Sequence, residues 1–205
     1  MSRFKTRLKR VRFELDLSAR GIPFVGRAVR GTLSIREYRD LLAQLEFVCR
    51  ALSTRGEDDP ATWIALCLRQ DQAQLEPVLS LAPAEPCMTV EWFSDAVHAR
   101  RWSALGPGAQ ATALLVLGTS WLSDARCALG ERAFPDAVSG LTALGRASHV
   151  ALDQMLSSSE SPGTSLGKQR IHSLTELTRG AVLGVVGYLD DLWPAPQLTI
   201  NIPNG

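Results

Sequence analysis

The segment from Ser34 to Leu52 constrains the fold more than any other part of the chain, because it carries a full set of helix signals. Ser34 is a favourable N-cap residue, and Glu37 follows three residues later, which is the spacing of a capping box. The apolar residues of the segment recur every three or four positions: Tyr38, Leu41, Leu42, Leu45, Val48, Cys49 and Leu52. This spacing predicts a helix with one apolar face, which Gly56 and Pro60 would end.

Most of the remaining chain repeats this helical spacing between breakers. We predict one or two helices over 61–82, interrupted or kinked at Pro77, and helices over 89–105, 109–134, 135–156 and 170–193, of which 109–134 is interrupted near its middle at 118–120. No set of alternating strands is evident, although "QLTINI" near the C-terminus could pair with "RVRFELDL" as a small hairpin. The sequence therefore predicts an all-α, single-domain helical bundle of about seven helices.

The length of 205 residues fits one domain with short extensions. We divide the chain into a basic N-terminal arm over 1–18, a helical domain over 19–193 and a C-terminal tail over 194–205. The arm carries six lysine or arginine residues before Glu14. Its apolar residues allow either an amphipathic helix or a short extended segment. We expect a solvated, partly frayed terminus rather than an arm that binds anions or a membrane surface.

Composition argues against several classes of protein. Hydrophobic residues make up 45% of the chain, charged residues 21%, and the net charge is +1, so the molecule as a whole has no strong attraction to nucleic acid. The longest apolar runs, 109–117 and 181–189, are too short for a membrane span. The four cysteines form no CxxC pair, which argues against a zinc ribbon. We expect a cytoplasmic protein with no membrane span and no nucleic-acid partner.

Two stretches of the sequence carry a resemblance to a known family. "PFVGRAVRGTLSIREYRDLLAQLEFVCRAL" resembles the first two helices of the heme-oxygenase-like superfamily, which includes heme oxygenases, thiaminase-II-like proteins and non-heme diiron oxidases. "ALLVLGTSWLSDARCALG" is similar to a later family segment that reads approximately "ALYVLEGSxLG". The resemblance covers about Leu15 to Leu129. It implies a pocket between helices, a heme or non-heme iron cofactor, and an oxidase or oxygenase activity.

The chain departs from the family at the positions that would bind iron. The family's heme oxygenases ligate iron through a histidine on the first helix, but here no histidine precedes His98, and Ile22 stands before Pro23. An aliphatic side chain cannot donate to iron. Gly118 replaces the acidic residue of the family's later segment. The chain is thus predicted to be a divergent member without the usual N-terminal histidine ligand.

A rebuilt metal site would need carboxylates and histidines that converge in the bundle. The candidate ligands are Glu46, Glu91, His98, His149 and Asp153. Each has an ordinary alternative: Glu46 could pair with Arg50 at i+4, His98 could be solvated, and His149 could hydrogen-bond Asp153 on the surface. The ordinary reading is the one we favour for each of them.

Basic residues of the arm could serve a bound cofactor. If heme binds, Arg7, Lys9 and Arg10 could meet its propionates, and with Glu46 and Gly118 these arginines complete our cofactor-binding candidates. The sequence therefore leaves two functions open. One is a divergent iron-dependent oxidase or a binder of a tetrapyrrole or other apolar small molecule. The other is a non-catalytic protein–protein interaction module or homodimer that has lost the ligands of the fold.

Overall fold

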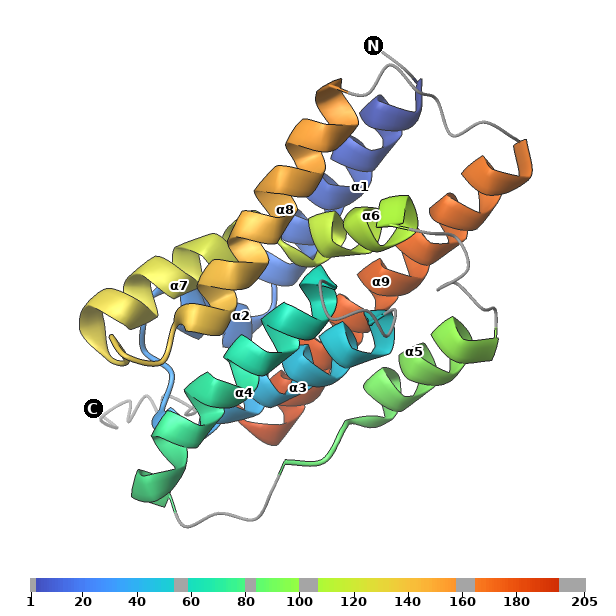
Figure 1. Ribbon diagram of the computed structural model, residues 1–205. Coiled ribbons are helices and arrows are strands. Elements are labelled where there is room, and N and C mark those ends of the chain that lie inside the picture. The colour runs from blue at the N-terminus through green and yellow to red at the C-terminus, as the bar shows by residue number, and fades with distance from the viewer. Residues whose placement is uncertain (1–2, 54–58, 80–83, 100–106, 158–164, 196–205) are drawn as a thin grey trace, which may run out of the picture.

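The computed structural model describes residues 3–53, 59–79, 84–99, 107–157 and 165–195, and every regular element in them is a helix (Figure 1). The all-α prediction is confirmed. The helices are α1 (Arg3–Arg20), α2 (Pro23–Val29), α3 (Ile35–Leu52), α4 (Pro60–Leu79), α5 (Met88–Ala99), α6 (Pro107–Leu117), α7 (Ser120–Arg132), α8 (Ser139–Ser157) and α9 (Ser165–Leu192). The described ranges thus hold nine helices rather than about seven.

Besides the helix that the N-terminal segment forms, two features account for the larger number. α2 is a separate short helix with Pro23 at its first position, and the Phe24 N–H donates to Asp190 Oδ1 of α9 over 2.7 Å. The second feature is a break at Gly118, which divides the predicted 109–134 helix into α6 and α7. In contrast, the helix is not interrupted at Pro77, because α4 continues past this residue and ends at Leu79.

The N-terminal segment is not a frayed arm, and this prediction was wrong. It forms α1, an 18-residue helix. Leu8, Val11 and Leu15 are at most 6% exposed, and Leu8 and Leu15 belong to the main hydrophobic core. Arg7, Lys9 and Arg10 are exposed beside these buried residues, as in the amphipathic helix that the spacing allowed. Because residues 10–17 are helical, they cannot form a strand of the hairpin, and "QLTINI" lies outside the described residues.

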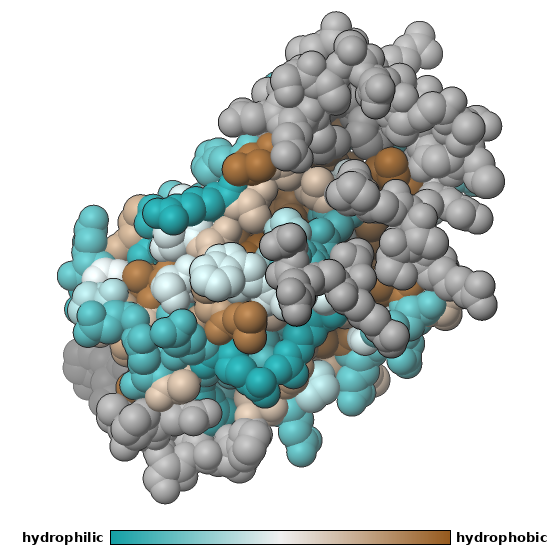
Figure 2. All heavy atoms as spheres, viewed as in Figure 1, coloured by the Kyte–Doolittle hydropathy of each residue, from teal (hydrophilic) through white to brown (hydrophobic). Residues whose placement is uncertain are grey.

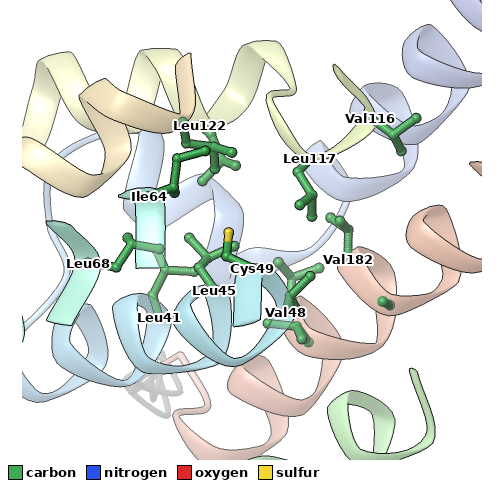
Figure 3. Close-up of a cluster of buried hydrophobic side chains, with 14 of the residues drawn as sticks. Leu41, Leu45, Val48, Cys49, Ile64, Leu68, Val116, Leu117, Leu122 and Val182 are labelled. Atoms are coloured by element: carbon green, nitrogen blue, oxygen red, sulfur yellow. The ribbon is translucent and has the colours of Figure 1, made fainter. Parts of the chain in front are cut away.

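α3 is the central helix of the bundle. Its predicted capping box is present: the Ser34 side chain accepts from the Glu37 N–H, and the Glu37 carboxylate accepts from the Ser34 N–H. α3 lies between α4 and α5, with α9 packed behind it (Figure 1). The core that they share is drawn in Figure 3, where side chains of α3, α4, α6, α7 and α9 point toward one another, among them Leu45, Ile64 and Leu117.

Two side chains of α1, one turn apart, form hydrogen bonds with the backbone at the break between α6 and α7. Arg12 Nη2 donates to the carbonyl oxygen of Gly118 over 2.5 Å, at the C-terminal end of α6. Asp16 Oδ1 accepts from the Trp121 N–H over 2.9 Å, in the first turn of α7. A cation at a helix C-terminus and an anion at a helix N-terminus both match the helix dipole. The break is therefore held by charges on a third helix.

Replacing Asp16 by asparagine should lower the free energy of unfolding by about 1 kcal/mol at neutral pH, since the charged cap is lost. Burial raises the pKa of Asp16, but hydrogen bonds from Arg20, Ser120 and the Trp121 N–H outweigh burial and hold the pKa below its usual value. A carboxyl with a lowered pKa stabilises the fold above its unfolded pKa and loses this contribution as the pH falls through the folded value.

Urea unfolding of both proteins at neutral pH and below about pH 4 measures this effect. The difference between the native protein and Asp16→Asn should shrink in acid. A difference that is the same at both pH values would show that the ionised form of Asp16 does not contribute.

None of the helices in the described ranges combines the length and the apolar character that crossing a membrane requires.

Candidate functional site

A groove of about 470 Å³ runs between α3 and α5 on the face of the molecule where these helices meet. Its lining residues are Phe47, Arg50 and Ala51 of α3, Pro86 before α5, and Val90, Glu91, Ser94, Asp95 and His98 of α5. On the face drawn in Figure 2, hydrophobic residues among those described form small separate patches between hydrophilic ones. The residues that line the groove thus combine an apolar floor with charged walls.

The wall formed by α5 is held in place from two sides. At its start, Gln44 of α3 is 2% exposed and bonds the chain twice: its Nε2 donates to the Glu85 carbonyl over 2.8 Å, and its Oε1 accepts from the Cys87 N–H over 2.9 Å. On the other side Thr89 packs against Gly184 of α9, where any β-carbon would overlap the threonine side chain. The glycine at 184 thus permits close helix packing.

Two carboxylates of this wall have no partner among the described residues. Glu91 and Asp95 are exposed, they are one turn apart, and neither forms an ion pair or hydrogen bond with a described side chain. His98 lies one turn further along the same face. Its Nδ1 is 2.7 Å from the Ser94 carbonyl oxygen, which can only accept, so Nδ1 carries the proton in the neutral ring. The His98 Nε2 atom then remains a hydrogen-bond acceptor.

The opposite edge of the groove is basic. Arg50 lines the groove and pairs with Glu46 over 2.9 Å, and Arg69 of α4 approaches the same carboxylate to 3.6 Å. Gln72 Nε2 donates to Glu46 as well, over 2.8 Å. The Glu46–Arg50 pairing expected from the sequence is confirmed. Because the Glu46 carboxylate is shared by two guanidinium groups, which are 45% and 63% exposed, it compensates the charge of Arg50 only in part, and the Arg50 edge of the groove stays positive.

Replacing Glu46 by alanine should destabilise the fold by about 1–2 kcal/mol, because two arginines and Gln72 lose a nearly buried acceptor. Replacing Arg69 alone should cost less than about 0.5 kcal/mol, since this side chain is 63% exposed. Urea unfolding of the two variants measures both values, and iron and manganese analysis of the same samples tests the alternative role of Glu46. A stable Glu46→Ala protein that loses bound metal would assign Glu46 to a metal site.

The structure places the five candidate metal ligands on three faces. Glu91 and His98 line the groove together, whereas Glu46 is turned toward α4 and does not line it. His149 is exposed on α8, and the side chain of Asp153 lies outside the described part of the chain. Within the described residues, no three histidine, cysteine, aspartate or glutamate side chains come close enough to share a metal ion.

The cofactor candidates are engaged in structural contacts. Arg7 hydrogen-bonds the His172 ring over 2.8 Å, and Arg10 pairs with Glu14 over 2.7 Å. At Gly118 the space for a side chain is filled by Ser148 of α8. None of these residues lines the groove between α3 and α5.

Of the nine residues that line the groove, the sequence analysis named two as site candidates, Glu91 and His98. Asp95 could have been found, because it falls on the face that Glu91 and His98 define, four residues after the one and three before the other. Phe47 and Ala51 could not, because their place in the floor depends on how α5 crosses α3. None of the described tryptophans lines this groove: Trp121 is fully buried, whereas Trp63 and Trp92 are more than half exposed.

No protein-family model matches this chain, and no curated protein matches it.

Proposed function

We propose that this chain is a non-catalytic helical binding protein, and that the groove between α3 and α5 is the surface that receives its partner. The groove itself carries the proposal. It joins an apolar floor at Phe47, Ala51 and Val90 to two carboxylates, Glu91 and Asp95, that have no partner among the described residues. Apolar area and unpaired charge of this kind are typical of a recognition surface.

The positions of the other candidate residues support binding rather than oxidation chemistry. Glu46 already accepts from Arg50 and Gln72 and approaches Arg69, so its lone pairs are occupied. A non-heme iron site draws several carboxylates and histidines to one point in a bundle core. Among the candidates whose side chains are described, only Glu91 and His98 share a surface, and both are exposed.

The oxidase or tetrapyrrole-binding function remains the second candidate, and one observation favours it. His98 has a free Nε2 atom while its Nδ1–H is held by a backbone carbonyl, and metal-binding histidines are commonly oriented in this way. Under this alternative, His98 would be the axial or metal ligand and Glu91 its neighbour in the groove.

Site-specific photo-crosslinking in cells of the source organism tests the proposal. A photoreactive residue at Met88, which is 82% exposed one turn before Glu91, should crosslink a partner at the groove. The same residue at Glu131, which is exposed on α7, serves as the control position. The Met88 crosslink should disappear when Ser94→Tyr fills the groove. Equal crosslinks from both positions, or none, would overturn the proposal.

A heme titration of the purified protein decides between the two candidates. We expect only weak, unsaturable uptake of heme and no stoichiometric iron or manganese. A saturable Soret band that His98→Ala abolishes would replace the binding-protein proposal with the tetrapyrrole-binding function.

A further inference from the structure

The charges of the groove specify what kind of partner it fits. Resting on the proposed function, we infer that the groove binds an amphipathic helix of a partner protein, with basic side chains toward α5 and acidic side chains toward Arg50. An apolar stripe of that helix would cover the floor. Helices that lie in grooves in this way are a recurring mode of recognition.

The α5 wall selects hydrogen-bond donors. Its two carboxylates can only accept, and in the tautomer that donates Nδ1–H to the Ser94 carbonyl the Nε2 atom of His98 is an acceptor as well. Lysine and arginine are the side chains that carry donors without acceptors. A row of acceptors therefore matches a row of basic side chains.

The spacing of this wall matches a helix. Glu91, Asp95 and His98 recur once per turn and span seven residues, about 10 Å at 1.5 Å per residue. A partner helix that runs alongside α5 rises by the same distance per residue. Basic residues at i, i+4 and i+7 of the partner would therefore face the three acceptors in turn.

The floor and the far edge complete the specification. Phe47 and Pro86 are half-buried and provide apolar surface, whereas Ala51 and Val90, which also line the groove, are 6% and 2% exposed. Beyond the floor, Arg50 shares the Glu46 carboxylate with Arg69, so its charge is compensated only in part and attracts acidic side chains.

The two signs of charge argue for a protein helix over the other extended partners. A nucleic-acid strand is uniformly anionic, and the Glu91–Asp95 wall would repel it. A membrane surface that is anionic meets the same repulsion, and it cannot enter a groove. Only a partner with a basic flank and an acidic flank satisfies both walls.

Synthetic peptides test this inference with the intact chain. The probe is a fluorescein-labelled helical peptide with a leucine stripe, lysines along one flank and glutamates along the other. The control peptide keeps the leucines and carries glutamate on both flanks. Exchange of the two flanks is no control, because reversal of the helix direction would restore the match. Fluorescence anisotropy gives the dissociation constants.

We expect the lysine–glutamate peptide to bind, and the double variant Glu91→Lys/Asp95→Lys to weaken it by roughly tenfold or more. The matched variant Glu131→Lys/Asp191→Lys makes the same change of charge at exposed positions outside the groove and should alter the affinity by less than about twofold. Circular dichroism checks that both variants are folded.

The outcomes separate this inference from the function on which it rests. If the dissociation constant of the peptide is unchanged in Glu91→Lys/Asp95→Lys, or if the control peptide binds equally well, the inference about the partner is overturned. If the peptide fails but the Met88 crosslink is still lost in Ser94→Tyr, the groove is a binding site for another chemistry. If the crosslink fails as well, both proposals fall.

Discussion

Replacing Gly118 by alanine is expected to lower the free energy of unfolding by about 3 kcal/mol. A β-carbon at this position would overlap Cβ and Oγ of Ser148, which is itself 1% exposed in α8. The glycine is needed for space and not for its backbone angles, because its φ is not in the left-handed region. α8 can approach the break between α6 and α7 only because residue 118 has no side chain.

A second change in the opposite helix makes the prediction sharper. Ser148→Gly removes the atoms that would clash, at a cost of about 1–2 kcal/mol for a glycine in a helix and a lost hydrogen bond to the Gly118 carbonyl. The double variant Gly118→Ala/Ser148→Gly should therefore be more stable than the sum of the single effects, by about 1–3 kcal/mol. Urea unfolding of the four proteins measures this coupling.

Gly145→Ala is the matched control, because Gly145 lies in the same helix as Ser148 and an added β-carbon there meets nothing within 4 Å. This substitution should stabilise the protein by up to about 1 kcal/mol, as alanine favours a helix. A Gly118→Ala protein of native stability would contradict the packing role and leave Gly118 as a candidate for contact with a cofactor.

The parts of the fold that the sequence predicted correctly are those that local chemistry determines. The start of α3 is the clearest case. The Ser34 and Glu37 side chains bond backbone atoms three residues away, so the cap needs no contact from elsewhere in the chain. The apolar spacing after it places Leu41, Leu42 and Leu45 in the core, and all three are at most 4% exposed.

The errors arise where distant segments decide the structure. The basic residues of α1 indicated a solvated arm, but Arg12 and Asp16 have partners more than a hundred residues away, at Gly118 and Trp121. No spacing within residues 1–18 reveals these partners. The interruption at 118–120 was predicted correctly, but the contacts that hold it were not, since the ends created at the break are bonded by α1.

The candidate site was predictable only along a single helix. Glu91 and His98 are seven residues apart, which places them on one face, and the structure does bring them to one groove. Glu46 is a charged residue among apolar neighbours in the sequence, and it is buried in the structure, at 4% exposure. Its direction could not be predicted, because this depends on Arg69 and Gln72 of α4, which packs beside it.

Replacing Asp71 by alanine should destabilise the protein by about 2 kcal/mol, because it leaves the buried Gly140 N–H without an acceptor and removes the bond from the Ser139 hydroxyl. Asp71 lies within α4 and is fully buried. Its carboxylate accepts from the Gly140 N–H over 2.7 Å and from the Ser139 hydroxyl, both in the first turn of α8. It acts as the cap of a neighbouring helix. Ser139→Ala removes one donor and keeps the other bond, so it should cost about 1 kcal/mol.

The pH dependence of Asp71 runs opposite to that of Asp16. Burial raises its pKa above the ordinary value, although the hydrogen bonds from Ser139 and Gly140 oppose this shift. A carboxyl with a raised folded pKa contributes stability that is fully present below the unfolded pKa and is lost as the pH rises through the folded value. Asp71→Asn cannot take up this proton. The native protein should therefore gain stability relative to Asp71→Asn as the pH falls from neutral toward about 4.5, as measured by urea unfolding. A difference in stability between the two proteins that stays constant, or that changes in the opposite direction, would show that the fold does not raise the pKa of Asp71.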